Sequence, residues 1–216
     1  MKNVFCDKGI IFDMDGTLWD SSEQVAKSWN LAIRDSGAAD LVLSADDIQR
    51  VMGMTMEAIA DELFGMLSKE DRMKLLSHCC NVENDYLREN GGRLYEGVEE
   101  TLGVLKESYP LFIVSNCQSG YIEAFLDYYG FGQYFTDIEC YGNNLKQKAE
   151  NIRLIVGRNH LKQAVYVGDI EADYRASKEA GVDFIHAAYG FGKIGDQVKE
   201  VSDFRELASA AFFQGE

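Results

Sequence analysis

The chain has 216 residues, of which 46% are hydrophobic and 12% aromatic, and its formal net charge at pH 7 is −15. This composition can bury a core, so it excludes a disordered chain, and its acidic balance excludes the cationic surface that a nucleic-acid-binding protein needs. No segment approaches the ~20 consecutive apolar residues that cross a bilayer. The first residues also lack the apolar region of a secretory signal, so we expect a cytoplasmic protein without a membrane partner.

The first predicted element is a strand at 9–12, an uninterrupted apolar run that leads into Asp13. From residue 20 to residue 92 the apolar spacing is helical throughout. Serine or threonine stands where three of these helices would begin, and the first of them has an aspartate three residues later, as in a capping box. These residues are Ser44, Thr55 and Ser68, with Asp47 completing the box. The pattern predicts four helices that form a small all-α domain inserted after the first strand.

Beyond residue 92, strands alternate with helices. Short apolar runs, as in strands buried on both faces, lie at 111–114, 135–140, 165–167 and 183–188. Helical spacing separates them at 98–105, 122–129 and 172–180, and Gly130 and Gly181 stand where the last two helices would be capped. The alternation predicts an α/β fold with a doubly wound, parallel, Rossmann-like sheet. The chemistry of such sheets lies beyond the carboxyl ends of the strands.

The first candidate site residues are Asp13 and Asp15, which follow the first predicted strand. Two carboxylates at this spacing can face the same crevice if the chain turns, and Gly16 permits a turn. One is then a candidate nucleophile and the other a candidate proton donor and acceptor. A solvated acidic turn is the alternative, but the apolar run before it would bury its base, where unbound acids are unfavourable.

A second acidic pair, Asp169 and Asp173, follows the strand predicted at 165–167. Four residues apart, both carboxylates can face one side of a first helical turn. Mg²⁺ prefers a few carboxylate oxygens together with water, and Asp13 and Asp169 on neighbouring strands can supply them. The alternative is that these acids only favour a helix N-terminus.

Phosphate-binding candidates follow the strand at 111–114 and precede the strand at 165–167. A hydroxyl and neighbouring amides at a strand-to-helix turn, as at Ser115 and Asn116, can hold phosphoryl oxygens, although an ordinary helix cap has the same pattern. Lys146 and Lys148 can each offset phosphate charge, although surface lysines are commoner. The sequence context favours Lys148.

Together, in this order and at these strand ends, the motifs resemble those of the haloacid dehalogenase superfamily. The matching motifs are DMDGT at 13–17, Ser115, Lys148 and GDIEAD at 168–173. Within the superfamily, the chain is similar to phosphoglycolate phosphatase-like enzymes that have a helical cap inserted after the first motif. The resemblance covers nearly the whole chain and implies an α/β core of residues 1–19 and 93–216, with a cap of residues 20–92.

The resemblance also implies roles for individual residues. Asp13 would attack phosphorus and become an aspartyl phosphate, and Asp15 would protonate the leaving oxygen and then activate water. Mg²⁺ would be held by the Asp13 carboxylate, the Asp15 carbonyl oxygen and Asp169, with Asp173 bound through water. The phosphate site would comprise Ser115, Asn116, Lys148 and Thr17, the last of which orients the loop. Dehalogenases of the superfamily lack a carboxylate in the place of Asp15, so its presence favours phosphoryl transfer.

The predicted function is magnesium-dependent hydrolysis of a small phosphorylated metabolite. A phosphomutase that returns the phosphoryl group to a sugar phosphate is an alternative, and so is a non-catalytic binding module on the same scaffold. The turn at 52–55, between two cap helices, can point toward the active site, as in similar proteins, or can simply pack. Trp19 and Trp29 are interpreted as packing residues.

Overall fold

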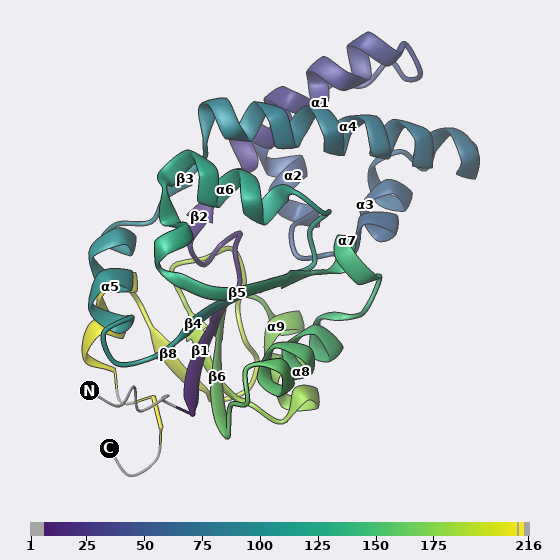
Figure 1. Cartoon of the computed structure of the whole chain (residues 1–216). Coiled ribbons are helices and arrows are strands. Elements are labelled where there is room, and N and C mark those ends of the chain that lie inside the picture. The colour runs from purple at the N-terminus through teal and green to yellow at the C-terminus, as the bar shows by residue number, and fades with distance from the viewer. Residues whose placement is uncertain (1–6, 211, 214–216) are drawn as a thin grey trace.

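The protein is described here from a computed structural model that covers residues 7–210, 212 and 213. Its centre is a six-stranded sheet in the order β5-β4-β1-β6-β7-β8, with every neighbouring pair parallel (Figure 1). The strands are β1 (Lys8–Phe12), β4 (Leu111–Ser115), β5 (Phe135–Cys140), β6 (Gln163–Gly168), β7 (Asp183–Ala187) and β8 (Lys199–Val201). The predicted doubly wound α/β fold is therefore confirmed.

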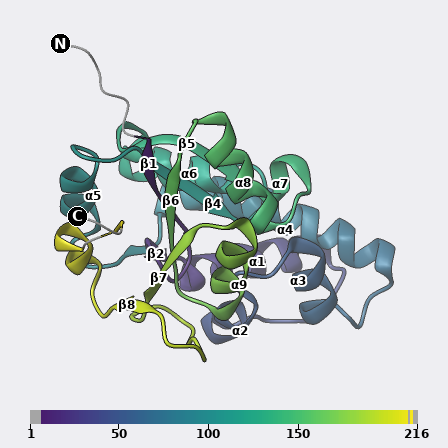
Figure 2. The same cartoon turned by 90° about the horizontal axis from the view of Figure 1, so that it is seen from below.

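Helices cover both faces of the sheet, because successive side chains of each strand point to opposite faces. Ile10 and Phe12 face a core formed with α5 (Val98–Leu105) and α6 (Tyr121–Tyr129). Ile11 faces the other core, formed with α8 (Lys148–Arg158) and α9 (Glu171–Ala180). Figure 2 shows α5 on one side of the sheet and α8 and α9 on the other. Strands buried in this way need uninterrupted apolar sequences, which is the pattern that identified them.

Helices α6 and α9 end at the glycines that the sequence predicts as their caps. Gly130 follows α6 with φ of 68° and Gly181 follows α9 with φ of 78°, so both occupy the left-handed region that glycine tolerates. The remaining short elements are α7 (Tyr141–Asn144) and the 3₁₀ helices η1 (Phe131–Gln133) and η2 (Phe204–Ser209).

Four helices lie between β1 and α5 in the sequence and pack beside one another above the sheet in Figure 1. They are α1 (Ser22–Ser36), α2 (Ala45–Val51), α3 (Met56–Leu63) and α4 (Lys69–Asn90). The predicted capping box at the start of α2 is present, since the Ser44 hydroxyl accepts from the Asp47 amide at 3.2 Å and the Asp47 carboxylate accepts from the Ser44 amide at 2.9 Å. The division into a core and a cap at residues 20 and 92 stays a prediction.

The chain passes to and from these helices through a small two-stranded sheet. β2 (Trp19–Asp20) and β3 (Arg93–Leu94) are antiparallel, with Trp19 opposite Leu94 and Asp20 opposite Arg93. The buried Trp19 ring packs edge-on against Tyr121 and Phe125 of α6, which fixes this crossing on the sheet.

Three features were not predicted. The two-residue strands β2 and β3 are too short to show a period, and β8 has the sequence Lys-Glu-Val, of which only Val201 is buried. Helix α8 was not assigned because its buried residues include the charged Lys148 and the polar Asn151. Local sequence carries little signal for elements that depend on distant partners.

Candidate active site

The predicted site residues gather at the carboxyl edge of the three central strands. Asp13 follows β1, Ser115 ends β4 and Asp169 follows β6, and β1 lies between the other two strands. After β1 the chain builds the sheet outward on the β4 side, and it then crosses to the β6 side. A reversal of this kind leaves a crevice at the strand ends, where open α/β sheets bind ligands.

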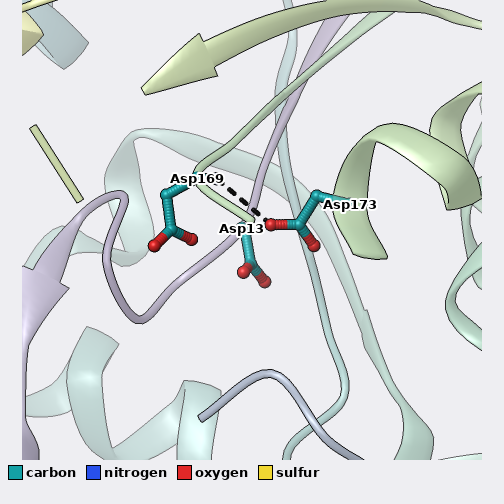
Figure 3. Close-up of side chains that lie close together, drawn as sticks. All are labelled: Asp13, Asp169 and Asp173. Atoms are coloured by element: carbon teal, nitrogen blue, oxygen red, sulfur yellow. Dashed lines mark hydrogen bonds between the residues drawn. The ribbon is translucent and has the colours of Figure 1, made fainter. Parts of the chain in front are cut away.

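Three buried carboxylates meet in this crevice. One oxygen each from Asp13, Asp169 and Asp173 lie within 4.8 Å of one another (Figure 3). Asp173 comes from the first turn of α9 and is fixed by the backbone, because its carboxylate accepts from the amides of Asp169 at 3.1 Å and Ile170 at 3.2 Å. Such a group of oxygen ligands can hold a hard divalent cation.

Of the described lysines, Lys148 contacts this cluster. The Lys148 ammonium donates to Asp13 at 3.0 Å and to Asp173 at 2.5 Å, and all three side chains are almost fully buried. Burial alone would lower the pKa of Lys148, but the two carboxylates raise it above its ordinary value. The lysine is therefore a fixed positive charge, in contrast to Lys146, which is exposed.

Ionisation of all the acids of the cluster would leave an excess of negative charge that a cation could neutralise. Burial, reinforced by Asp173, raises the pKa of Asp13 to about 7, even though Lys148 opposes the rise. Burial, Asp173 and Asp13 raise the pKa of Asp169 to about 8. Three carboxylates face one ammonium, so the residues fit a divalent cation in both charge and ligand chemistry.

Two glycines allow the backbone to approach Asp169. Gly16 has φ of +79°, and a Cβ placed on it would collide with the Asp169 carboxylate; a Cβ on Gly190 would meet the Gly16 carbonyl and Asp169. The Phe191 amide donates to the Asp169 carboxylate at 2.8 Å, and a ring nitrogen of His186 lies 3.1 Å from the Asp169 carbonyl oxygen. These contacts hold Asp169 toward the loop that carries Asp13.

Asp15 is held apart from the cluster by a different set of partners. Its Oδ1 accepts from the hydroxyls of Ser21 and Tyr121, each at 2.7 Å. Ser21 precedes α1 but does not cap it, because its hydroxyl is turned toward Asp15 instead. Burial raises the pKa of Asp15 to about 6, while the bonds from Ser21 and Tyr121 lower it. This value suits a group that gives and takes a proton near neutral pH.

The predicted phosphate-binding residues lie around these acids. Ser115 and Thr17 are buried, and the Thr17 hydroxyl has no hydrogen-bond partner among the described residues. Asn116 donates from its side-chain nitrogen to the Gly53 carbonyl at 2.8 Å, so it joins the strand end to the turn between α2 and α3. The structure thus brings Ser115, Asn116 and that turn to the same pocket.

A pocket opens on the side of Asp15 that faces helices α1–α4. Ser115, Asn116 and Tyr121 line it from the sheet side. Apolar residues line it from the helices, among them Val25, Trp29, Ile48, Met52 and Met54. The turn at 52–55 therefore contributes to the pocket.

Several residues of this site were not predicted from the sequence. Ser21 and Tyr121 gave no signal, because a serine or tyrosine near a helix start is common. Trp29 was interpreted as packing, and it does stack on Phe64, but it also lines the pocket. Glu83 was missed although it lies four residues from both Cys79 and Leu87, on the buried face of α4. An acid in an apolar stripe is a signal that could have been used.

Comparisons with known proteins agree with this geometry. The model of the haloacid dehalogenase-like hydrolase family matches residues 10–187. The chain belongs to this family. A phosphoglycolate phosphatase of Yersinia pseudotuberculosis is 25% identical to this hydrolase over 195 residues, covering 85% of this chain and 82% of the relative. A phosphoglycolate phosphatase of Aliivibrio fischeri is 27% identical over 199 residues, covering 85% of each.

Solved structures show the same fold. A protein from Haemophilus somnus, described as a predicted phosphoglycolate phosphatase, superposes with a TM-score of 0.80 at 23% identity, covering 97% of this hydrolase and 99% of that chain. CbbY from Rhodobacter sphaeroides, solved with xylulose-1,5-bisphosphate, superposes with a TM-score of 0.77 at 18% identity, covering 94% and 96%. In the part of the chain that is described, no helix is long and apolar enough to cross a membrane.

Proposed function

We propose that this hydrolase is a magnesium-dependent phosphatase that cleaves a small phosphate monoester through a phosphorylated Asp13. The observation that carries the proposal is the position of Asp13. Its buried carboxylate lies 3.0 Å from the Lys148 ammonium and within 4.8 Å of ligand oxygens of Asp169 and Asp173. Asp15 lies two residues further along the chain and lines the pocket between the sheet and helices α1–α4.

In the first step, an oxygen of Asp13 attacks phosphorus as the bond between phosphorus and the ester oxygen breaks. Asp15 gives its proton to the departing oxygen, so the alcohol leaves uncharged. We assign Lys148, Ser115, the backbone amide of Asn116 and the Thr17 hydroxyl to the phosphoryl oxygens, whose charge is stabilised by fixed cations and hydrogen-bond donors. The unpartnered Thr17 hydroxyl supports this assignment, since a buried donor is unfavourable unless something binds it.

In the second step, water attacks the aspartyl phosphate. Asp15, now ionised, takes a proton from the water, and the Asp13 carboxylate is released together with inorganic phosphate. Asp15 ends the cycle protonated, as it began. The bonds from Ser21 and Tyr121 keep its carboxyl group pointed at the pocket through both steps.

We assign Mg²⁺ to Asp13 and Asp169, with the Asp15 carbonyl oxygen as a further ligand and Asp173 acting through water. When bound, the ion offsets the negative charge of the carboxylates and of the phosphoryl group. The donor set supports this assignment, because three buried carboxylates face one lysine. The relatives are named phosphoglycolate phosphatases, so phosphoglycolate is one candidate substrate.

Release of phosphate from an aryl phosphate tests the proposal. Wild type should release phosphate with Mg²⁺ and not with EDTA, and Asp13→Asn should lower kcat by at least about 10³-fold. Asp183→Asn, which changes an exposed aspartate at the start of β7, is the matched control and should retain full activity.

Activity that survives in Asp13→Asn would refute Asp13 as the nucleophile. If folded wild type released no phosphate from any ester but became phosphorylated on Asp13 by a sugar phosphate, phosphoryl transfer to an alcohol would replace hydrolysis as the function.

A further inference from the structure

The pocket between the sheet and helices α1–α4 is lined by acidic, neutral polar and apolar side chains, and none of its described lining residues is cationic. Among its described lining residues there is no lysine, arginine or histidine, and the ionisable carboxyl groups are those of Asp15 and Glu83. An ester of a hydroxy acid would bring a further carboxylate into this pocket. A carboxylate in a poorly solvated pocket is unfavourable unless a cation pairs with it.

Glu83 forms part of the pocket wall and is held in place by a hydrogen bond. It projects from the buried face of α4, is only 3% exposed, and accepts a hydrogen bond from the Trp29 indole of α1 at 2.6 Å. Burial raises the pKa of Glu83 to about 8, although hydrogen bonds with Trp29 and Gln118 lower it. Among the described residues, no lysine or arginine lines the pocket beside this carboxyl group, so an incoming anion would also lack a cationic partner there.

Asn116 provides a second acceptor among the residues that line this pocket. The Asn116 side-chain nitrogen donates to the Gly53 carbonyl, which can only accept, so the other atom of the amide must be the oxygen. This Oδ1 is buried and has no hydrogen-bond partner in the described part of the protein. A buried acceptor without a partner is uncommon in a native structure, and a donor on a ligand would satisfy it.

We propose, on the basis of the phosphatase function above, that the leaving group is a small alcohol whose far end donates hydrogen bonds and carries no negative charge, and that Glu83 determines this selectivity. The methylene part of the alcohol packs on the apolar side chains, and its hydroxyl or ammonium group donates to Glu83 and Asn116. Phosphoglycolate, whose far end is a carboxylate, is then a poor substrate for this enzyme, unlike for the relatives that carry its name.

Three esters of nearly equal size test this selectivity. They are 2-hydroxyethyl phosphate, phosphoethanolamine and phosphoglycolate, which end in a hydroxyl, an ammonium and a carboxylate. We expect kcat/KM for at least one of the first two to exceed that for phosphoglycolate by at least about 10-fold. The better of the two identifies the donor that the pocket takes.

Glu83→Gln is the diagnostic variant, read as the ratio of kcat/KM for the preferred ester to that for phosphoglycolate. The ratio cancels changes that affect both esters, and it should fall at least about 5-fold. Glu89→Gln, on the exposed face of the same helix, is the matched control and should leave the ratio unchanged. Trp29→Phe, which removes the hydrogen bond that orients Glu83, should lower the ratio in the same direction and serves if Glu83→Gln does not fold.

The outcomes separate this inference from the phosphatase function. Equal or better hydrolysis of phosphoglycolate by wild type overturns the inference and leaves the phosphatase intact. An unchanged ratio in both Glu83→Gln and Trp29→Phe overturns the role of Glu83. No phosphate release from any of the three esters or from an aryl phosphate overturns the phosphatase function itself.

Discussion

Replacing Asp13 by asparagine should stabilise the metal-free protein while it removes activity. The Asp13 carboxyl group is 3% exposed, and its pKa rises from 3.8 to about 7 on folding. Between these two values the folded protein holds a proton that the unfolded chain has lost. The free energy of unfolding of wild type therefore falls as pH rises through this window.

The magnitude follows from the size of this shift. A rise of roughly three pKa units, at about 1.4 kcal/mol each, corresponds to up to roughly 4 kcal/mol of lost stability above pH 7. Asparagine has almost the same shape and cannot ionise, so Asp13→Asn escapes this loss. At pH 4 the folded aspartate is protonated and the unfolded one is only about half ionised, so the two proteins should differ little in stability.

Urea unfolding in EDTA, from about pH 4 to about pH 8, measures this difference. The advantage of Asp13→Asn should grow steadily with pH, and saturating Mg²⁺ should reduce it, because bound cation stabilises the folded wild type. Asp183→Asn, an exposed control, should show no such trend. A variant that is less stable than wild type at pH 8, or an advantage that does not change with pH, would refute the reasoning about the buried carboxylates.

Three further predictions concern the neighbours of this residue. Gly16→Ala should lower kcat by at least about 10²-fold and weaken the activation by Mg²⁺, because the added methyl group collides with the Asp169 carboxylate and alanine disfavours the positive φ of this position. An unchanged dependence of activity on Mg²⁺ concentration would contradict this prediction. Tyr121→Phe should shift the Asp15 limb of the pH profile of kcat/KM to higher pH, because the hydrogen bond from Tyr121 lowers the pKa of Asp15. Tyr128→Phe, which changes an exposed tyrosine of α6, is the control and should not shift it. Mg²⁺ at 100 times its Kd should stabilise wild type by about 2.7 kcal/mol in thermal or urea unfolding, and Asp169→Asn should lose most of this gain.

The fold and the strand-end acids could be predicted because both are local in the sequence. An apolar run of four or five residues identifies a strand wherever its partners are, and the residue after it lies at the edge of the sheet. Asp13 and Asp169 could therefore be placed near each other without knowledge of the intervening chain. Asp173 followed from Asp169 through helical spacing alone.

The pocket could not be predicted, because it depends on how helices pack. The hydrogen bond between Trp29 and Glu83 joins residues 54 positions apart, and it exists only because α1 lies against α4. Nothing in the local sequence fixes which helix faces meet. Tyr121 reaches Asp15 for a similar reason, since two loops that are distant in the sequence end at the same edge of the sheet.

The small sheet of β2 and β3 affects how the chain can fold. The partners Trp19 and Leu94 are adjacent in space, so this pairing closes the long loop that contains all four inserted helices. Loop closure carries an entropic cost that grows only slowly with length. Once the pairing has formed, β1 and β4 can join as though they were close in the sequence. The order of events therefore need not follow the order of the chain: the parallel sheet can assemble before or after the helices of the insertion have found one another.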